Sequence, residues 1–137
     1  MGLTYANIQL QNGGDFSDYL QGRISETDIR RIDICVAVNN NSVLPTINES
    51  TRKALDLPII EIRNYQFRDG KYQKLPVVGS IIVKYLDRWS LTNAILVPDT
   101  QLLLLGNIPM SEMDLHVHPR RNELLPVHPD GPLMSLK

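Results

Sequence analysis

The sequence predicts a small, mostly β protein with one or two short helices. Three observations support this prediction. Apolar and polar residues alternate along several segments, as they do in strands that bury one face. Asp69-Gly70 separates two such segments, and this dipeptide is a strong signal for a β-hairpin turn. Helix-start signals occur at Asn48, a favoured N-cap residue, and at Pro109, which suits the first turn of a helix.

Each expected element follows from a local pattern. The first strand ends at Asn12-Gly13-Gly14, and we expect the polar residues 15–29 to form a loop with room for one helical turn. The expected strands are residues 5–10, 31–38, 59 to the turn at 69–70, 75–85 with a bend at Gly79-Ser80, 91–97, 102–105 and a terminal hairpin of 115–118 and 122–127. The expected helices are residues 49–55, ended by Leu57-Pro58, and residues 108–114.

Length and composition bound the class of protein. The 137 residues predict one domain, spanning 1–137, with about the last ten (128–137) as a loose tail. A net charge of -1, without a basic cluster, argues against a nucleic-acid or membrane-surface partner. The lone Cys35 excludes an internal disulfide and fits a reducing compartment. Because we find neither a secretory signal nor a membrane-spanning run, we expect a soluble, cytoplasmic protein.

The strand at residues 31–38 runs directly into three asparagines, Asn39-Asn40-Asn41, followed by Ser42. Three consecutive amides are an unusual end for a strand. Two further features follow in order along the chain. The first is the Asp69-Gly70 hairpin, and the second is Leu104-Leu105-Gly106-Asn107 before a short helix.

The order and spacing of these three features resemble the retropepsin-like aspartic proteases, especially the small bacterial and cyanobacterial members. In that family the first feature is a hydrophobic residue followed by Asp-Thr/Ser-Gly-Ala, the second is the flap, and the third is two hydrophobic residues followed by glycine. The segments LTYANIQL, TINEST and LLLLGNIPMSEMDL also have the look of that family, so the resemblance covers nearly the whole chain. It implies a closed β-barrel of the acid-protease type that works as a homodimer. It also implies an extended peptide or unfolded segment as ligand, in a cleft covered by flaps.

The resemblance assigns the site residue by residue. Asn39 falls at the catalytic aspartate, Asn40 at the Thr/Ser position whose hydroxyl interlocks the two loops, Asn41 at the glycine and Ser42 at the alanine. The flap tip corresponds to Arg68, Asp69 and Gly70, and the support beneath the cleft to Leu105, Gly106 and Asn107. The family uses no cofactor, and we expect none here.

An amide at residue 39 removes the chemistry of the family. An aspartic protease shares one proton between two carboxylates, one from each subunit of a homodimer. Asparagine has nearly the same shape but no useful basicity, so both general base and shared proton are lost. We therefore expect a catalytically silent aspartic endopeptidase, that is, a pseudoenzyme. Natural loss of the site and deliberate inactivation both fit the three asparagines.

Two alternatives belong to other classes. The chain fits a structural or interaction module with a vestigial cleft. In that case no added peptide would protect the segment around Asp69-Gly70. It also fits a small β-barrel unrelated to proteases, whose asparagines form an ordinary polar turn. A monomeric mass in solution would favour that unrelated barrel.

A few residues outside these motifs have reactive side chains. His116 and His118 share one face of an expected strand and could meet His128, but no carboxylate or cysteine motif supports a metal, and we predict none. We expect Cys35 to be a buried small hydrophobe, and Tyr85 and Trp89 to be packing residues.

Overall fold

The fold is mostly β, as the sequence predicts. The computed structural model describes residues 3–39, 41–67, 69–99 and 101–133. Its strands are β1 (Tyr5–Asn12), β2 (Arg31–Ala37), β3 (Thr46–Ile47), β4 (Ile59–Gln66), β5 (Tyr72–Tyr85), β6 (Arg88–Leu96), β7 (Leu115–His118) and β8 (Glu123–Pro126). Its helices are α1 (Gly13–Leu20), the short 3-10 helix η1 (Glu26–Asp28), α2 (Glu49–Leu55) and α3 (Asn107–Glu112).

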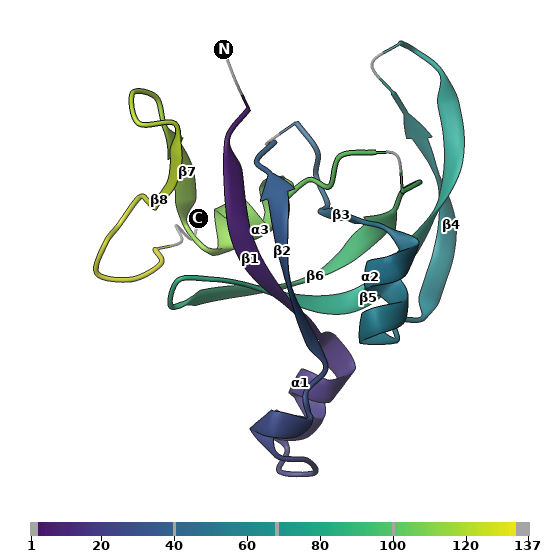
Figure 1. The fold of residues 1–137 in the computed structure, drawn as a ribbon, viewed down its shortest axis with the longest axis vertical. Helices are drawn as coiled ribbons and strands as arrows, with labels where there is room; N and C mark the ends of the chain where they lie inside the picture. Colours follow the sequence, from purple (N-terminus) through teal and green to yellow (C-terminus); the bar gives the residue numbers. More distant parts are fainter. Residues whose placement is uncertain (1–2, 40, 68, 100, 134–137) are drawn as a thin grey trace, which may run out of the picture.

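The strands form one large sheet and one small one (Figure 1). The large sheet has the order β2-β1-β5-β6-β3, with β4 paired to β5 beyond this path. Its ladders are antiparallel except for the short parallel pair of β3 and β6. β7 and β8 form the small sheet, which is the terminal hairpin that the sequence predicts.

The ends of the large sheet are joined through residues 103–105 and not through a strand-to-strand ladder. Ala37 at the end of β2 donates its N–H to the carbonyl of Leu103 (2.8 Å), and Leu105 donates to the carbonyl of Ala37 (2.8 Å). On the other side, Thr46 of β3 donates to the carbonyl of Leu104 (3.0 Å). Residues 102–105 are therefore not the separate strand that the sequence predicts, because they make only an isolated bridge. The described strands form no closed barrel.

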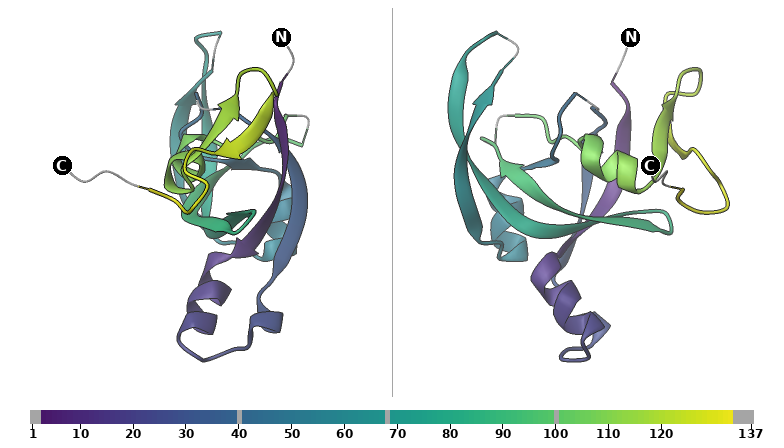
Figure 2. Two further views of the ribbon diagram at one scale, coloured as in Figure 1. Left: turned by 90° about the vertical axis from the view of Figure 1, so that its left-hand side faces the viewer. Right: turned by 180° about the vertical axis from the view of Figure 1, so that it is seen from behind.

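The hairpin of β4 and β5 extends away from the rest of the sheet, as the views from two sides agree (Figure 2). Its turn is closed by Phe67, whose N–H donates to the carbonyl of Lys71 (2.8 Å) and whose carbonyl accepts from Gly70 (3.0 Å). The Asp69-Gly70 turn is thus where the sequence predicts it, although β5 begins at Tyr72, earlier than expected.

The helices differ from the prediction in number. α2 begins after Asn48, whose side chain accepts from the N–H of Thr51 (2.9 Å), as predicted. α1 occupies residues that we expect to form a loop. It begins because Asn12 caps it, accepting from the N–H of Asp15 (2.9 Å), and Asp15 in turn binds Arg30. There are three α-helices in the described chain, not one or two.

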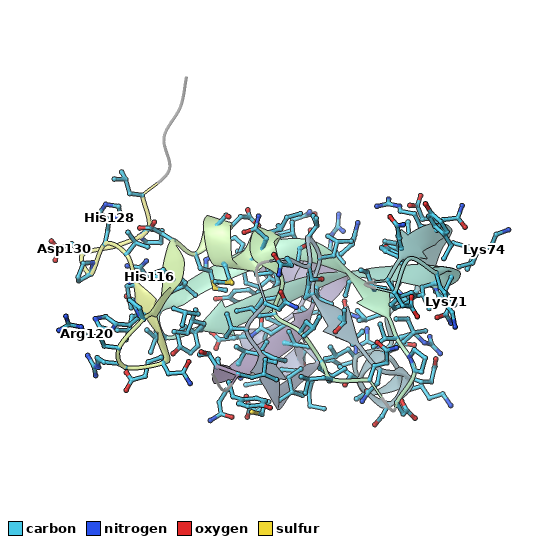
Figure 3. All side chains as sticks on the ribbon, turned by 90° about the horizontal axis from the view of Figure 1, so that it is seen from above. Lys71, Lys74, His116, Arg120, His128 and Asp130 are labelled. Carbon is cyan, nitrogen blue, oxygen red and sulfur yellow. The ribbon has the colours of Figure 1, made fainter. Side chains whose placement is uncertain are left out.

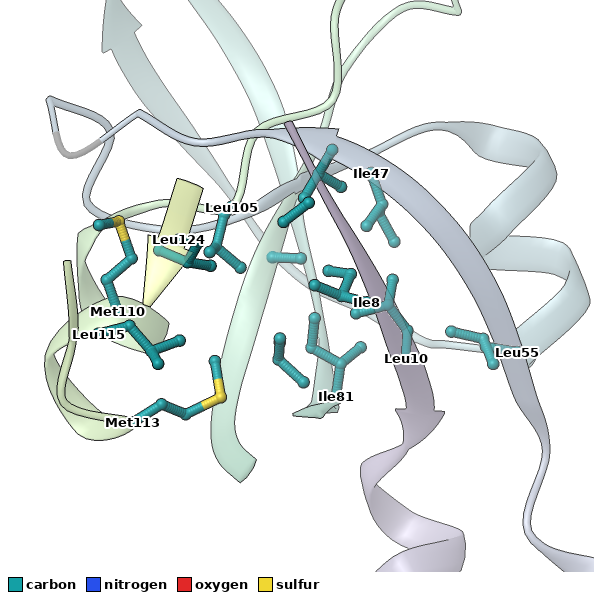
Figure 4. Close-up of a cluster of buried hydrophobic side chains, with 14 of the residues drawn as sticks. Ile8, Leu10, Ile47, Leu55, Ile81, Leu105, Met110, Met113, Leu115 and Leu124 are labelled. Carbon is teal, nitrogen blue, oxygen red and sulfur yellow. The ribbon is translucent and has the colours of Figure 1, made fainter. Parts of the chain in front are cut away.

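The main core lies between the large sheet, α2, α3 and the terminal hairpin (Figure 4). The labelled side chains in that view are Ile8, Leu10, Ile47, Leu55, Ile81, Leu105, Met110, Met113, Leu115 and Leu124. A second, smaller cluster has Leu75, Ile95 and Val97 at its centre. It lies where the β4–β5 hairpin leaves the sheet.

Cys35, Tyr85 and Trp89 differ in how deeply they are packed. Cys35 is exposed, so its predicted burial is wrong, because it lies on the face of β2 opposite Val36. Tyr85 is packed against the core and donates its hydroxyl to the carbonyl of Leu124 (2.9 Å). Trp89 packs on Phe16, with ring centroids 5.2 Å apart, but stays half exposed.

Candidate functional site

Two of the three predicted site segments, the loop after β2 and residues 103–108, meet at the end of β2. Val38 continues from this strand and donates its N–H to the carbonyl of Thr4 (2.8 Å). Ala37 is paired with residues 103–105 as described above. The loop that follows therefore begins from a fixed point, held on one side by the N-terminal segment and on the other by residues 103–105.

The loop of residues 39–44 is ordered by its own polar side chains. Asn39 is half-buried, and its Oδ1 accepts from the N–H of Asn41 (2.9 Å), which makes an Asx turn. Ser42 donates its hydroxyl to the carbonyl of Leu44 (2.7 Å). Asn40 lies outside the described residues, and Asn41 is exposed. Asn39 is thus held by a local turn that needs only the oxygen of its side chain, which a carboxylate would also supply.

The predicted support residues contact this loop directly. The backbone N–H groups of Asn107 and Ile108 donate to the carbonyls of Ser42 (2.6 Å) and Val43 (3.0 Å). Gly106 packs so closely that an added Cβ would lie 2.6 Å from the carbonyl carbon of Leu44. Since its φ is 85° and its ψ 162°, only glycine fits this position comfortably. The structure therefore brings Asn39, Ser42, Gly106 and Asn107 together, and Leu105 lies fully buried beneath them.

Thr46 also contacts the site segments, although no sequence pattern assigns it a role. Its buried hydroxyl accepts from the N–H of Leu104 (2.8 Å), while its own N–H donates to the carbonyl of Leu104 (3.0 Å). This double contact fixes residues 103–105 between β2 and β3. No local pattern identifies it, because its partner is 58 residues further along the chain.

The β4–β5 hairpin packs against the same small core cluster as Leu44 of the loop. Tyr65 and Phe67 pack with Leu44 and Leu103 against the smaller core cluster. The hydroxyl of Tyr65 is enclosed without a hydrogen-bond partner among the described residues, and its burial raises the pKa of the phenol. Asp69 and Gly70 are exposed at the tip, where Asp69 Oδ1 accepts from the N–H of Lys71 (2.9 Å). Arg68, the third predicted flap residue, lies outside the described residues.

The chemistry available at Asn39 is limited to hydrogen bonding. In the part of the chain that the structure describes, no Asp or Glu side chain is hydrogen-bonded to the loop of residues 39–44. A hollow of about 510 Å³ borders Val38 and Asn107 on the side facing Leu3, α3 and β7. The described side-chain contact of Asn39 is thus a hydrogen bond within its own loop, and the imidazole of His116 is among the groups that line the hollow beside Val38 and Asn107.

The three histidines lie in separate environments in the described structure. His118 Nδ1 accepts from the N–H groups of Arg120 (3.3 Å) and Arg121 (3.2 Å) in its own turn. His128 Nδ1 is hydrogen-bonded to Asp114 (2.6 Å), and this bond holds the pKa of Asp114 below its usual value. Among the described residues no group of three potential ligands comes together. In the view from above, His116 and His128 lie at the opposite end of the molecule from Lys71 and Lys74 (Figure 3).

Arg88 is the buried charge that the sequence did not reveal. Its guanidinium donates to the carbonyl of Met113 (2.8 Å) and to that of His128. It therefore ties the end of α3 and the start of the last segment, residues 128–133, to β6. Arg88 lies far along the chain from these partners, so only the fold identifies its role.

Comparison with known proteins adds no family. No family model matches the chain, and a search of curated proteins finds none that matches it. No helix in the described ranges is long and apolar enough to cross a membrane.

Proposed function

We propose that this protein is a retropepsin-like homodimer with Asn39 at the catalytic aspartate position, which binds extended peptide segments without cleaving them. The observation that carries the proposal is the meeting of two of the predicted segments. Asn39 begins a loop whose carbonyls at Ser42 and Val43 accept hydrogen bonds from Asn107 and Ile108, while Phe67 of the hairpin and Leu44 of the loop pack against the same small core cluster. These segments are far apart in sequence, and the family resemblance expects them to meet.

Loss of catalysis follows from the side chain at residue 39. Two aspartates close to one another share a proton, so one polarises the scissile carbonyl while the other activates water. Two asparagines can donate and accept hydrogen bonds but cannot take a proton from water. General acid–base catalysis contributes typically about a hundred- to ten-thousand-fold, and here water activation itself is lost.

Peptide binding needs no carboxylate. An extended peptide is held by backbone hydrogen bonds and by pockets for its side chains. The inner side of the hairpin offers Tyr65 and Phe67, and the opposite side of the cleft offers the amides of Asn39 and Asn41.

Assembly around Asn39 would also use surface near the chain ends. Leu3 and Tyr5 expose 53% and 54% of their area, and Leu3 borders the hollow beside Val38. Residues 3–10 and 124–127 are mostly paired within the chain, in β1 and β8. The proposed dimer therefore joins through exposed side chains near the N-terminus, and not through strands exchanged along their length. We place the dimer in the cytoplasm, since the exposed thiol of Cys35 suits a reducing compartment.

The test restores the family motif. A triple variant, Asn39→Asp with Asn40→Thr and Asn41→Gly, should cleave an unstructured protein, best at acidic pH, and should be blocked by statine-type inhibitors. The acidic optimum is expected because two close carboxylates cannot both ionise, so the pair retains one proton. The matched control keeps Asn39 and changes only residues 40 and 41, and it should stay inactive. A folded, dimeric triple variant without cleavage at any pH would refute the assignment of residue 39.

Binding by the natural sequence is tested separately. Titration with a library of extended peptides should slow amide hydrogen exchange at Asp69 and Gly70, which otherwise exchange quickly at an exposed tip. If no peptide protects the hairpin, the chain is an interaction module with a vestigial cleft.

A further inference from the structure

The outer edge of β4 is a second surface that the proposed site does not use. Within the described sheet β4 pairs only with β5, and seven of its eight residues are exposed. Three of these are isoleucines, Ile59, Ile60 and Ile62, which expose 52%, 51% and 57% of their area. Proteins usually protect an edge of this kind with charges, proline or a covering element, because its free backbone groups can pair with another strand.

The backbone of this edge is suited to accept another strand. In an antiparallel ladder the residue pairs alternate between those that exchange hydrogen bonds and those that do not. Phe67 donates a hydrogen bond to Lys71, so every second residue of β4 before Phe67 belongs to a hydrogen-bonded pair with β5. Arg63, paired with Leu75, is one of these residues. Ile62, opposite Pro76, therefore directs its N–H and carbonyl away from β5. Proline has no N–H to donate, so its place opposite Ile62 agrees with this alternation.

The charges of β4 are complementary to those of its own reversed sequence. Glu61 and Arg63 flank Ile62, lie on one face of the strand and form an ion pair within the chain. If a second β4 runs antiparallel with its Ile62 opposite Ile62, each Glu61 faces the other copy's Arg63. The same register sets Ile60 opposite Asn64, but the β4–β5 pairing is irregular between Ile59 and Glu61, so the contact rests on the outward backbone groups of Ile62 in the two copies.

We propose that the β4 edge binds the β4 edge of a second copy of this chain, antiparallel and centred on Ile62. The two large sheets then continue through the contact, and Ile62 of one copy covers Ile62 of the other. Opposite charges directly across an antiparallel pair are favourable, and like charges are unfavourable. A chain that carries both this surface and the surface near Asn39 assembles beyond a dimer, as a closed tetramer or an open filament.

The experiment separates this contact from the ion pair within the chain. Glu61→Arg gives a strand with two arginines, and Arg63→Glu gives one with two glutamates. Each variant alone should associate about tenfold more weakly than the natural chain, because both cross-strand pairs become repulsive. An equimolar mixture should recover the natural affinity, although neither chain can form the internal ion pair. The side chains are 44% and 55% exposed, so both variants should fold, with unchanged urea unfolding midpoints.

Sedimentation equilibrium measures the outcome. The natural chain should reach at least twice the mass of either variant alone, whether the variant is a monomer or the dimer formed near Asn39, with twice the mass for a closed assembly and more for an open filament. Lys53→Glu is the control. It makes the same charge change as Arg63→Glu, but at an exposed residue of α2, and it should assemble like the natural chain. Variants that assemble like the natural chain, or a mixture that fails to recover, would overturn the proposal. Neither result would bear on residue 39.

Discussion

Replacing Gly106 by alanine is expected to be among the most destabilising single methyl additions to this fold. The residue has a φ of 85° and a ψ of 162°, a region that residues with a side chain rarely adopt. Holding alanine there costs of order 1–3 kcal/mol. The new Cβ would also lie 2.6 Å and 2.7 Å from the carbonyl carbon and oxygen of Leu44, and 2.8 Å from the nitrogen of Pro45. These are backbone atoms, so no side chain can rotate to relieve the contact.

Relief of that contact requires the loop that follows Asn39 to move. Overpacking of this kind costs about 1–3 kcal/mol, so the two effects together predict a loss of about 2–6 kcal/mol. Urea unfolding at equilibrium measures the loss. For a slope of about 2 kcal/mol per molar, a loss of about 4 kcal/mol lowers the midpoint by roughly 2 M.

Gly22→Ala is the matched control. Its φ is also positive, at 76°, but no described atom lies within 4 Å of an added Cβ. It should cost only the backbone strain, about 1–2 kcal/mol. If Gly106→Ala and Gly22→Ala lower the urea midpoint equally, Gly106 does not pack against residues 44 and 45. The contact between residues 103–108 and the loop after Asn39 would then be wrong.

Three further predictions concern polar contacts within the fold, the first of them at the site. Thr46→Val leaves the N–H of Leu104 without its acceptor and should cost about 1–3 kcal/mol in urea unfolding, whereas Thr46→Ser keeps the acceptor and should cost less than half as much. Asn12→Ala removes the α1 cap and a 2.7 Å bond to the carbonyl that ends α2, and should cost about 2 kcal/mol; a loss below about 0.5 kcal/mol would contradict both contacts. The hydrogen bond from Arg30 lowers the pKa of Asp15 below 3.8, so its stabilisation is complete above that value and is lost as the pH falls through the lowered pKa. The natural chain should therefore lose more stability than Asp15→Asn between about pH 5 and pH 2, and equal losses would exclude this linkage.

Elements defined by local chemistry could be predicted from the sequence. Asn48 caps α2 with its own side chain, and Asp69-Gly70 forms a turn within four residues, so neither depends on distant contacts. The alternation along β2 likewise indicates which face is buried. The predicted burial of Cys35 is wrong. Alternation along β2 places its side chain on the sheet face opposite to that of buried Val36, and this position decides its exposure although cysteine is usually a buried residue.

Elements defined by distant contacts could not be predicted. Gly13-Gly14 resembles the end of a strand and not the start of a helix, yet Asn12 and Arg30 together stabilise α1. The apolar run at residues 102–105 has the composition of a strand, but it passes between β2 and β3 and bonds to both. For the same reason the motif order indicated which residues meet near Asn39, while the roles of Thr46 and Arg88 became visible only in the fold.

The distance between the two copies of residue 39 tests the central claim most directly. In the proposed dimer these residues meet at the twofold axis, where paired carboxylates of the family lie about 3 Å apart. Asn39→Cys, in a chain whose exposed Cys35 is changed to serine, should therefore form a disulfide between copies on mild oxidation. Ser50→Cys in the same background, on the exposed first turn of α2, should not cross-link under these conditions. The account predicts rapid, nearly complete cross-linking through residue 39 alone. Cross-linking at residue 39 that is no faster than at residue 50 would contradict it.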